Sequence, residues 1–301
     1  MSFQNIVLGN YLHVIDRYFP KLYKQIIESY MVFGGIPYYL NYLRPSLSLA
    51  QNIDLLFFKE NSSLKHEYTQ LFSSLYKNTE NYTAIVTELS RSGYGLTRVE
   101  LSGKEHIVSG KELTKCLENL EQCGFIRKYQ DFTKKSSGFI YQLIDPLTLF
   151  CLHFLESDKI DSWMEYINTP SYYSWCGLAF ERVCFLHTAQ IKQALGIAGI
   201  STHEFSWRSK HSHPGAQIDL LIDRKDDVIN ICEIKYTQDS FSIDSDYEKS
   251  LRNKLEAFRN ETGTKKALML VFIALNGLSS SPYSQIVTRA LTSDDLFLPD
   301  S

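Results

Sequence analysis

The stretch AQIDLLIDRKDDVINICEIKY, residues 216–236, decides the fold of the C-terminal half of the chain. Two β-rich runs flank a charged turn, and side chains on a strand point alternately to opposite faces of a sheet. If the turn centres on Asp226, Asp219 and Glu233 become cross-strand neighbours with Cβ atoms about 5 Å apart. Glu233 then shares its face with Lys235.

Two carboxylates this close repel each other unless a positive charge lies between them. Mg²⁺ is suited to this position because it takes oxygen ligands from one or two carboxylates and keeps several waters. Lys235 would project beside the metal and position the attacking water or stabilise charge on a phosphate. Glu181 is a third acid, in an otherwise apolar helical stretch where an unpartnered carboxylate is costly to bury. The pattern predicts a site for Mg²⁺ or Mn²⁺ held by Glu181, Asp219 and Glu233.

A plainer interpretation stays open beside this one. Alternation in any half-exposed antiparallel hairpin also produces an acid, a turn, an acid and a lysine, all of them facing solvent. The segments around the hairpin therefore help to decide between the two interpretations. A long helix over residues 175–195, a strand at 204–210, a helix near 247–260 and a buried apolar strand at 265–275 give the order helix, three strands, helix, strand. This order predicts an α/β domain over residues 151–301.

Residues 1–65 read as a helical segment. The apolar spacing of residues 22–33 is helical, and the Gly34-Gly35-Ile36-Pro37 turn ends that helix, because glycine adopts the left-handed cap and Pro37 begins the next helix.

Residues 66–150 have the order of a winged helix, namely three helices followed by two alternating strands at 125–145. The third helix begins after Ser109, a predicted N-cap with Glu112 completing a capping box, and ends at Gly124. The helix over 111–122 carries three acids against two lysines, which opposes its approach to a DNA backbone and favours packing against a protein.

Composition excludes several classes of protein. The 301 residues are 44% hydrophobic and carry a net charge of −3, which is typical of a soluble globular protein. Neither half is strongly basic, so the footprint of a free-standing nucleic-acid binder is missing. Six cysteines without CxxC spacing, no signal-peptide pattern and no long apolar run predict a cytoplasmic protein that does not enter a membrane.

The acid, hairpin and Glu-x-Lys pattern resembles the PD-(D/E)xK nuclease superfamily, whose fold is restriction-endonuclease-like. The resemblance implies that Glu181 is the helix acid, Asp219 the first strand acid, and Glu233 and Lys235 the Glu-x-Lys pair. Gln217 and Ile218 precede Asp219, so the proline of the motif is absent.

The whole chain resembles the C-terminal portion of the archaeal-type ATPase family, through FGGIPYYL (33–40), AFERV (179–183), QIDLLID (217–223) and CEIKY (232–236). In that family a P-loop ATPase domain precedes a helical lid, a winged helix and a nuclease-like domain. No G-x-x-x-x-G-K-[ST] occurs here, so ATPase activity is not expected from this chain. The chain is then expected to be a fragment or to act with an ATPase domain from elsewhere.

The sequence thus predicts an α+β multidomain protein with a helical lid-like segment, a winged helix and a PD-(D/E)xK-like domain. Two functions stay open. One is Mg²⁺-dependent hydrolysis of DNA by Glu181, Asp219, Glu233 and Lys235. The other is a non-catalytic regulatory or interaction module for an ATPase domain or another protein, favoured by the acidic balance of residues 151–301.

Overall fold

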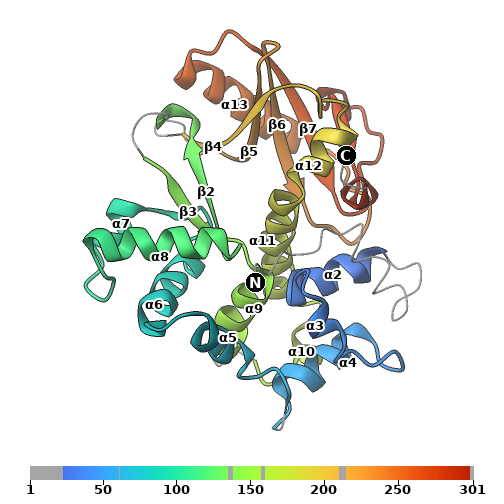
Figure 1. The fold of residues 1–301 in the computed structure, drawn as a ribbon. Coiled ribbons are helices and arrows are strands. Elements are labelled where there is room, and N and C mark those ends of the chain that lie inside the picture. The colour runs from blue at the N-terminus through green and yellow to red at the C-terminus, as the bar shows by residue number, and fades with distance from the viewer. Residues whose placement is uncertain (1–22, 61, 135–137, 157–159, 210–214, 299–301) are drawn as a thin grey trace. The chain divides into compact units, whose positions relative to one another are not determined.

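A computed structural model describes residues 23–60, 62–134, 138–156, 160–209 and 215–298 (Figure 1). The chain divides into two compact units. The first comprises Met1–Lys128 and Ile140–Leu186, and the second comprises Tyr129–Phe139 and His187–Ser301. The predicted three-domain division, with boundaries at 65 and 150, stays a prediction.

The first unit is mostly helical. Its described helices and strands are α2 (Tyr23–Phe33), α3 (Pro37–Leu40), α4 (Leu49–Ile53), α5 (Glu67–Leu75), α6 (Thr79–Ser90), β1 (Leu96–Thr97), α7 (Arg98–Ser102), α8 (Gly110–Gln122), β3 (Ile140–Leu143), α9 (Pro146–Phe150), α10 (Trp163–Tyr166) and α11 (Pro170–Leu186), together with the start of β2 (Ile126–Asp131). π-Helical turns at Asp54–Phe58 and Cys151–Leu155 continue α4 and α9.

Buried aromatic rings form the core of the first unit. Trp163 and Trp175 lie edge to face with ring centroids 5.4 Å apart, and Phe154 contacts both rings. Aromatic pairs in this geometry contribute beyond the area they bury. The predicted turn after α2 is confirmed, since Gly34 has φ +65° and Pro37 opens α3.

Residues 79–143 fold in the order helix, short strand, helix, helix and two strands. β1 pairs antiparallel with β3 and lies directly before α7. The helix predicted between Ser109 and Gly124 is confirmed as α8, and Gly124, with φ +78°, follows its end.

The capping box predicted at Ser109 and Glu112 is wrong. Ser109 is the N-cap residue of α8, but its side chain makes no capping hydrogen bond. Gly110 has φ +62°, so the chain enters α8 through a left-handed residue. A capping box does form at Thr97 and Glu100, where it begins α7.

Gly95 is expected to tolerate no side chain. Its φ is +95°, and a Cβ atom there would lie 2.5 Å from the carbonyl oxygen of Tyr141 on β3. Both the backbone conformation and the close approach require glycine. We expect Gly95→Ala to lower the free energy of unfolding by more than about 1 kcal/mol in urea denaturation. Gly110→Ala is the matched control, because its φ is also positive but nothing lies within 4 Å of the added atom. Equal losses for the two variants would contradict the steric part of this argument.

The second unit is built on the strands that include the quoted hairpin. Its described elements are α12 (Thr188–Ala194), β4 (Thr202–Arg208), β5 (Gln217–Arg224), β6 (Val228–Lys235), α13 (Ser245–Thr262), β7 (Ala267–Ala274) and β8 (Arg289–Leu291). β4, β5 and β6 form an antiparallel meander, and α13 connects β6 to β7, which runs parallel to β6. The described strands pair in the order β1-β3-β2-β4-β5-β6-β7-β8 and make a mixed sheet. The predicted order of helix, three strands, helix and strand is thus present.

One face of this sheet packs against α13. The core cluster there includes Trp207, Leu221, Ile231, Leu251 and Phe258, all nearly inaccessible to solvent. Figure 1 shows α13 lying along the strands.

The end of β2 joins the second unit, although it lies far from it in sequence. Gln130 and Asp131 pair in parallel with Phe205 and Ser206 on β4. Phe132 follows them, and its ring lies 5.5 Å from that of Phe205 and 5.2 Å from that of Phe258. These contacts explain why Tyr129–Phe139 is part of the second unit.

The single long helix predicted over residues 175–195 is wrong. The structure has two helices, with α11 ending at Leu186 and α12 beginning at Thr188. The break lies at His187, whose φ of −112° and ψ of 30° are not helical. It coincides with the boundary between the two compact units.

Within the described residues, no helix is both long and apolar enough to cross a lipid bilayer. None of the six cysteines, all of which are described, forms a disulfide, and five of them are buried.

Candidate functional site

The β5–β6 hairpin has the register that the sequence predicts. Leu220 lies opposite Cys232 and Leu221 opposite Ile231. The paired residues end at Leu220 and Cys232, one residue short of Asp219 and Glu233, and the turn centres on Asp226 as predicted. The pairing of β5 with β4 shifts register between Ile218 and Leu221, so simple alternation does not set the face of Asp219. Leu221 and Ile231 lie on the face that α13 covers.

Glu233 lies on the same face and is almost fully buried, with 9% of its surface exposed. Its Oε1 atom accepts a hydrogen bond of 2.6 Å from the Tyr247 hydroxyl. Its Oε2 atom lies 2.5 Å from the Lys254 ammonium, and Lys235 Nζ lies 3.4 Å from Oε1. A buried carboxylate is stable only when it is paired and hydrogen-bonded in this way.

These partners control the protonation of Glu233. Burial alone raises the pKa of the carboxyl group, but the charges of Lys254 and Lys235 and the hydrogen bonds from Lys254 and Tyr247 outweigh burial and hold the pKa below its ordinary value. Glu233 is therefore ionised at neutral pH.

The lowered pKa has a consequence for stability. A group whose pKa is depressed in the folded protein stabilises the fold above its unfolded pKa, and this contribution is lost as the pH falls through the folded pKa. We expect the stability difference between the wild type and Glu233→Gln to be full at neutral pH and to shrink below about pH 4.5, the ordinary pKa. Urea denaturation of both proteins from pH 7 to pH 3 measures it, and a difference that is independent of pH would contradict the assignment.

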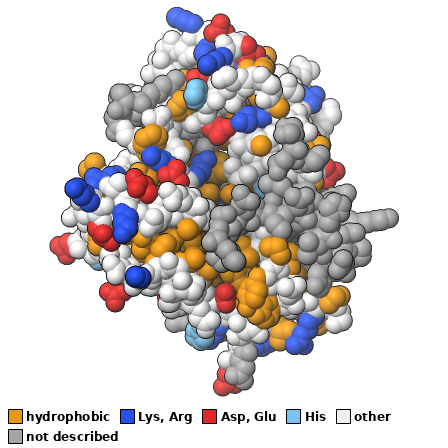
Figure 2. Space-filling view, viewed as in Figure 1, with side chains coloured by type: hydrophobic (Ala, Val, Ile, Leu, Met, Phe, Trp, Pro, Cys, Tyr) orange, Lys and Arg blue, Asp and Glu red, His pale blue; other side chains and the backbone are white. Residues whose placement is uncertain are grey.

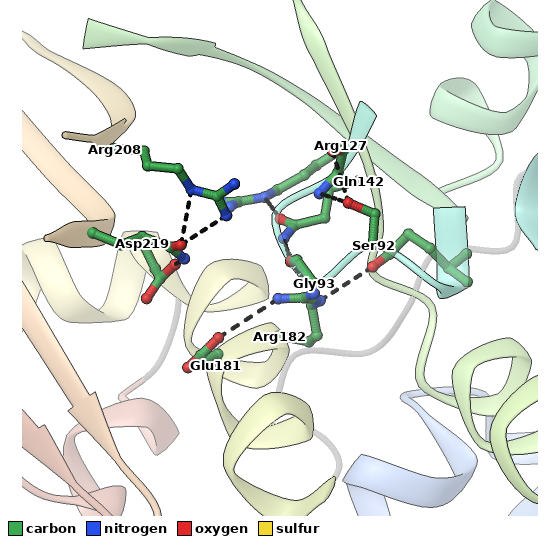
Figure 3. A network of polar contacts seen from close by, with 11 residues as sticks. Ser92, Gly93, Arg127, Gln142, Glu181, Arg182, Arg208 and Asp219 are labelled. Atoms are coloured by element: carbon green, nitrogen blue, oxygen red, sulfur yellow. Dashed lines mark hydrogen bonds and ion pairs between the residues drawn. The ribbon is translucent and has the colours of Figure 1, made fainter. Parts of the chain in front are cut away.

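Asp219 is half-buried and more open than Glu233. Its carboxylate accepts a hydrogen bond from Gln217 Nε2. Gln217 in turn accepts two hydrogen bonds from the Arg208 guanidinium, of 3.1 Å from Nε and 2.8 Å from Nη2. Figure 3 shows this chain of contacts running from Arg208 to Asp219. The arrangement orients the Asp219 carboxylate.

Lys235 is partly exposed and remains close to the acids. Besides its contact with Glu233, its ammonium lies 5.5 Å from the centre of the Tyr247 ring, a cation–π distance. The structure therefore brings Glu233 and Lys235 together, and it holds Asp219 on β5, the other strand of the same hairpin.

Glu181 belongs to the first unit. It lies on α11, partly exposed, with Oε2 3.8 Å from Arg182 Nη1. Arg182 is buried and donates hydrogen bonds to the carbonyl oxygens of Leu143 and Gly93, of 3.2 and 2.6 Å, which fixes this end of the helix (Figure 3). The approach of Glu181 to the strand acids stays a prediction.

The residues present on the hairpin fit a divalent cation. Tyr247, Lys235 and Lys254 already contact both oxygens of Glu233, so a cation would bind there in competition with these partners. Asp219 adds an accessible carboxylate. In the described part of the chain, no group of three or more His, Cys, Asp or Glu side chains is gathered as a metal site. The donor set on the hairpin is therefore two carboxylates, which Mg²⁺ supplements with water or phosphate oxygens.

Tyr247 and Lys254 were missed by the sequence interpretation. The signal was present in the spacing of α13, where Tyr247, Leu251, Lys254 and Phe258 are separated by four, three and four residues. This spacing places all four on one face of a helix. A lysine within an otherwise apolar, sheet-facing stripe indicates a buried acidic partner.

The first unit holds a cavity of about 630 Å³, a volume typical of small-molecule sites. Its lining combines apolar side chains such as Leu152 and Trp175 with polar ones such as His153, Glu156 and Arg182. None of the four predicted site residues is among those that line it.

No protein-family model, no curated protein and no solved structure shows a significant match to the chain.

Proposed function

We propose that the second unit is a PD-(D/E)xK-like nuclease domain that hydrolyses DNA phosphodiester bonds with Mg²⁺ or Mn²⁺. The observation that carries the proposal is the β5–β6 hairpin, which holds Asp219 on one strand and Glu233 on the other, with Lys235 Nζ 3.4 Å from Glu233. The order of helix, antiparallel meander, helix and parallel strand around this hairpin supports it.

Each residue has a role in this proposal. Asp219 and Glu233 hold the cation, which supplies Lewis-acid stabilisation of the phosphate when bound. Glu233 stays ionised because two ammonium groups and a phenol surround it. Arg208 and Gln217 orient the Asp219 carboxylate. Lys235 keeps a positive charge beside the acids, where negative charge develops on the phosphate.

The remaining segments are assigned by the same proposal. Residues 66–150, which include the order of helix, strand, two helices and two strands over 79–143, are a winged helix. The chain corresponds to the C-terminal portion of an archaeal-type ATPase-family protein. On the face shown in Figure 2, acidic and basic side chains are interspersed rather than gathered into one basic surface. The mixed charge of α8, with Glu112, Glu118 and Glu121 beside Lys111 and Lys115, favours a protein partner for this segment over DNA.

A non-catalytic module is the second candidate, and one observation favours it. Lys254 and Lys235 already neutralise Glu233, so the hairpin is electrostatically balanced without a metal ion. In this case the second unit is a scaffold that acts with an ATPase domain or another protein.

Cation-dependent cleavage of DNA distinguishes the two candidates. The purified chain is incubated with supercoiled and linear DNA in Mg²⁺, in Mn²⁺, in Ca²⁺ and in excess chelator. The nuclease proposal predicts cutting with Mg²⁺ or Mn²⁺ that the chelator abolishes. A complete lack of cutting across the range of cations and DNA forms would contradict it and favour the scaffold.

A further inference from the structure

Lys254 occupies an unusual position on α13. Its neighbours on the sheet-facing stripe, Leu251 and Phe258, are 1% and 0% exposed. The Lys254 side chain is itself only 18% exposed. Lysine rarely lies so deep unless its ammonium is paired, and the partner here is Glu233.

Lys254 is the closer of the two lysines to Glu233. Lys254 Nζ lies 2.5 Å from Oε2, whereas Lys235 Nζ lies 3.4 Å from Oε1 and its side chain is 38% exposed. Among the described residues, Lys254 alone contacts Oε2, while Oε1 also accepts the hydrogen bond from Tyr247.

We propose that Lys254 is a built-in counter-ion that competes with the divalent cation for Glu233, so that a cation binds only by displacing the Lys254 ammonium from Oε2. This inference rests on the proposed cation site and adds a regulator of its affinity. When a carboxylate oxygen accepts a short, charge-assisted hydrogen bond, a cation that binds the same oxygen must displace the donor. Two positive charges at one oxygen also repel each other.

The proposed competition predicts that removing the Lys254 ammonium tightens the binding of the divalent cation, whereas removing a side chain from a binding site usually weakens binding. Lys254→Met keeps the length and apolar stem of the side chain but removes the ammonium. Hydrogen bonds to charged groups are strong enough that their loss changes an equilibrium by about tenfold or more. We therefore expect Lys254→Met to bind Mn²⁺ at least about tenfold more tightly than the wild type.

Mn²⁺ titration followed by electron paramagnetic resonance measures this affinity directly, without any need for DNA cleavage. The shift in thermal midpoint on adding Mn²⁺ is a second reading, expected to be larger for Lys254→Met than for the wild type. Lys249→Met is the matched control, since Lys249 lies on the same helix but is 70% exposed and pairs with Asp246. Its Mn²⁺ affinity is expected to equal that of the wild type.

Lys254→Gln is measured beside Lys254→Met because it keeps a neutral donor for Glu233 and so protects the fold. It is expected to bind Mn²⁺ more tightly than the wild type, by a smaller factor. If the wild type binds Mn²⁺ and both Lys254 variants bind it equally or more weakly, the competition is overturned while the cation site stands. If no protein in the series binds Mn²⁺, both the competition and the proposed cation site are overturned.

Discussion

Replacing Asp219 by alanine is expected to abolish Mg²⁺-stimulated DNA cleavage, with a loss of at least about a hundredfold in rate. A bound cation supplies several kcal/mol of charge stabilisation in the transition state, and each 1.4 kcal/mol is a factor of ten. Asp219 is the informative position because it is half-buried, so its removal costs little stability. Initial cleavage rates over a range of Mg²⁺ concentrations measure the effect.

Glu233 requires a milder change. Glu233→Ala would leave the Lys254 ammonium without its acid in a buried position, which threatens the fold. Glu233→Gln keeps the shape of the side chain and is expected to lose cleavage to a similar extent. Asp223→Ala is the control, since Asp223 lies on the same strand but pairs with Lys266 at 2.7 Å. Cutting that survives in both the Asp219 and Glu233 variants would exclude the hairpin as the catalytic site.

Trp207→Ala is expected to give the largest loss of stability, about 3–5 kcal/mol. Trp207 is fully buried on β4, and its ring meets that of Phe258 edge to face at 5.3 Å. The change leaves a cavity between the sheet and α13. Urea denaturation followed by far-ultraviolet circular dichroism, analysed for the transition of the second unit, measures it.

Trp207→Phe separates the effect of lost side-chain volume on stability from the effect of the buried indole N–H group. The indole Nε1 atom is buried, and no described residue accepts its hydrogen bond. Phenylalanine removes this unsatisfied donor together with part of the ring, so its cost is expected to be smaller than that of alanine. Equal costs for the two variants, or a loss below about 1 kcal/mol for alanine, would contradict the assignment of Trp207 to the core.

The hairpin was predictable because its signals are local. Alternation sets which residues share a face, and the charged turn between two β-rich runs sets the register. The same holds for the turn at Gly34, the end of α8 at Gly124 and the buried strand β7, each of which depends on residues close in sequence.

The features that sequence did not predict depend on contacts between distant segments. The pairing of Asp131 with Ser206 joins residues on separate strands, and no local pattern reports it. The break at His187 interrupts a continuous helical periodicity, so the pattern alone favoured one helix. At Ser109 the residue types suit a capping box, but the left-handed Gly110 directs the chain differently.

The candidate site was predictable in part for the same reason. Asp219, Glu233 and Lys235 lie on one hairpin, and Glu233 and Lys235, two residues apart on β6, are in contact. Lys254 comes from a helix that packs on that hairpin, so its contact with Glu233 follows only once α13 is placed on the sheet. Glu181 lies in the other compact unit, where no hairpin geometry constrains it.

Calorimetric titration of Mn²⁺ into the wild type, Asp219→Asn and Asp223→Asn tests the central claim most directly. The account predicts saturable binding to one site in the wild type, the same binding in Asp223→Asn, and none in Asp219→Asn. An absence of binding to the wild type, or binding that Asp219→Asn leaves unchanged, would contradict the claim that the two hairpin acids hold a cation.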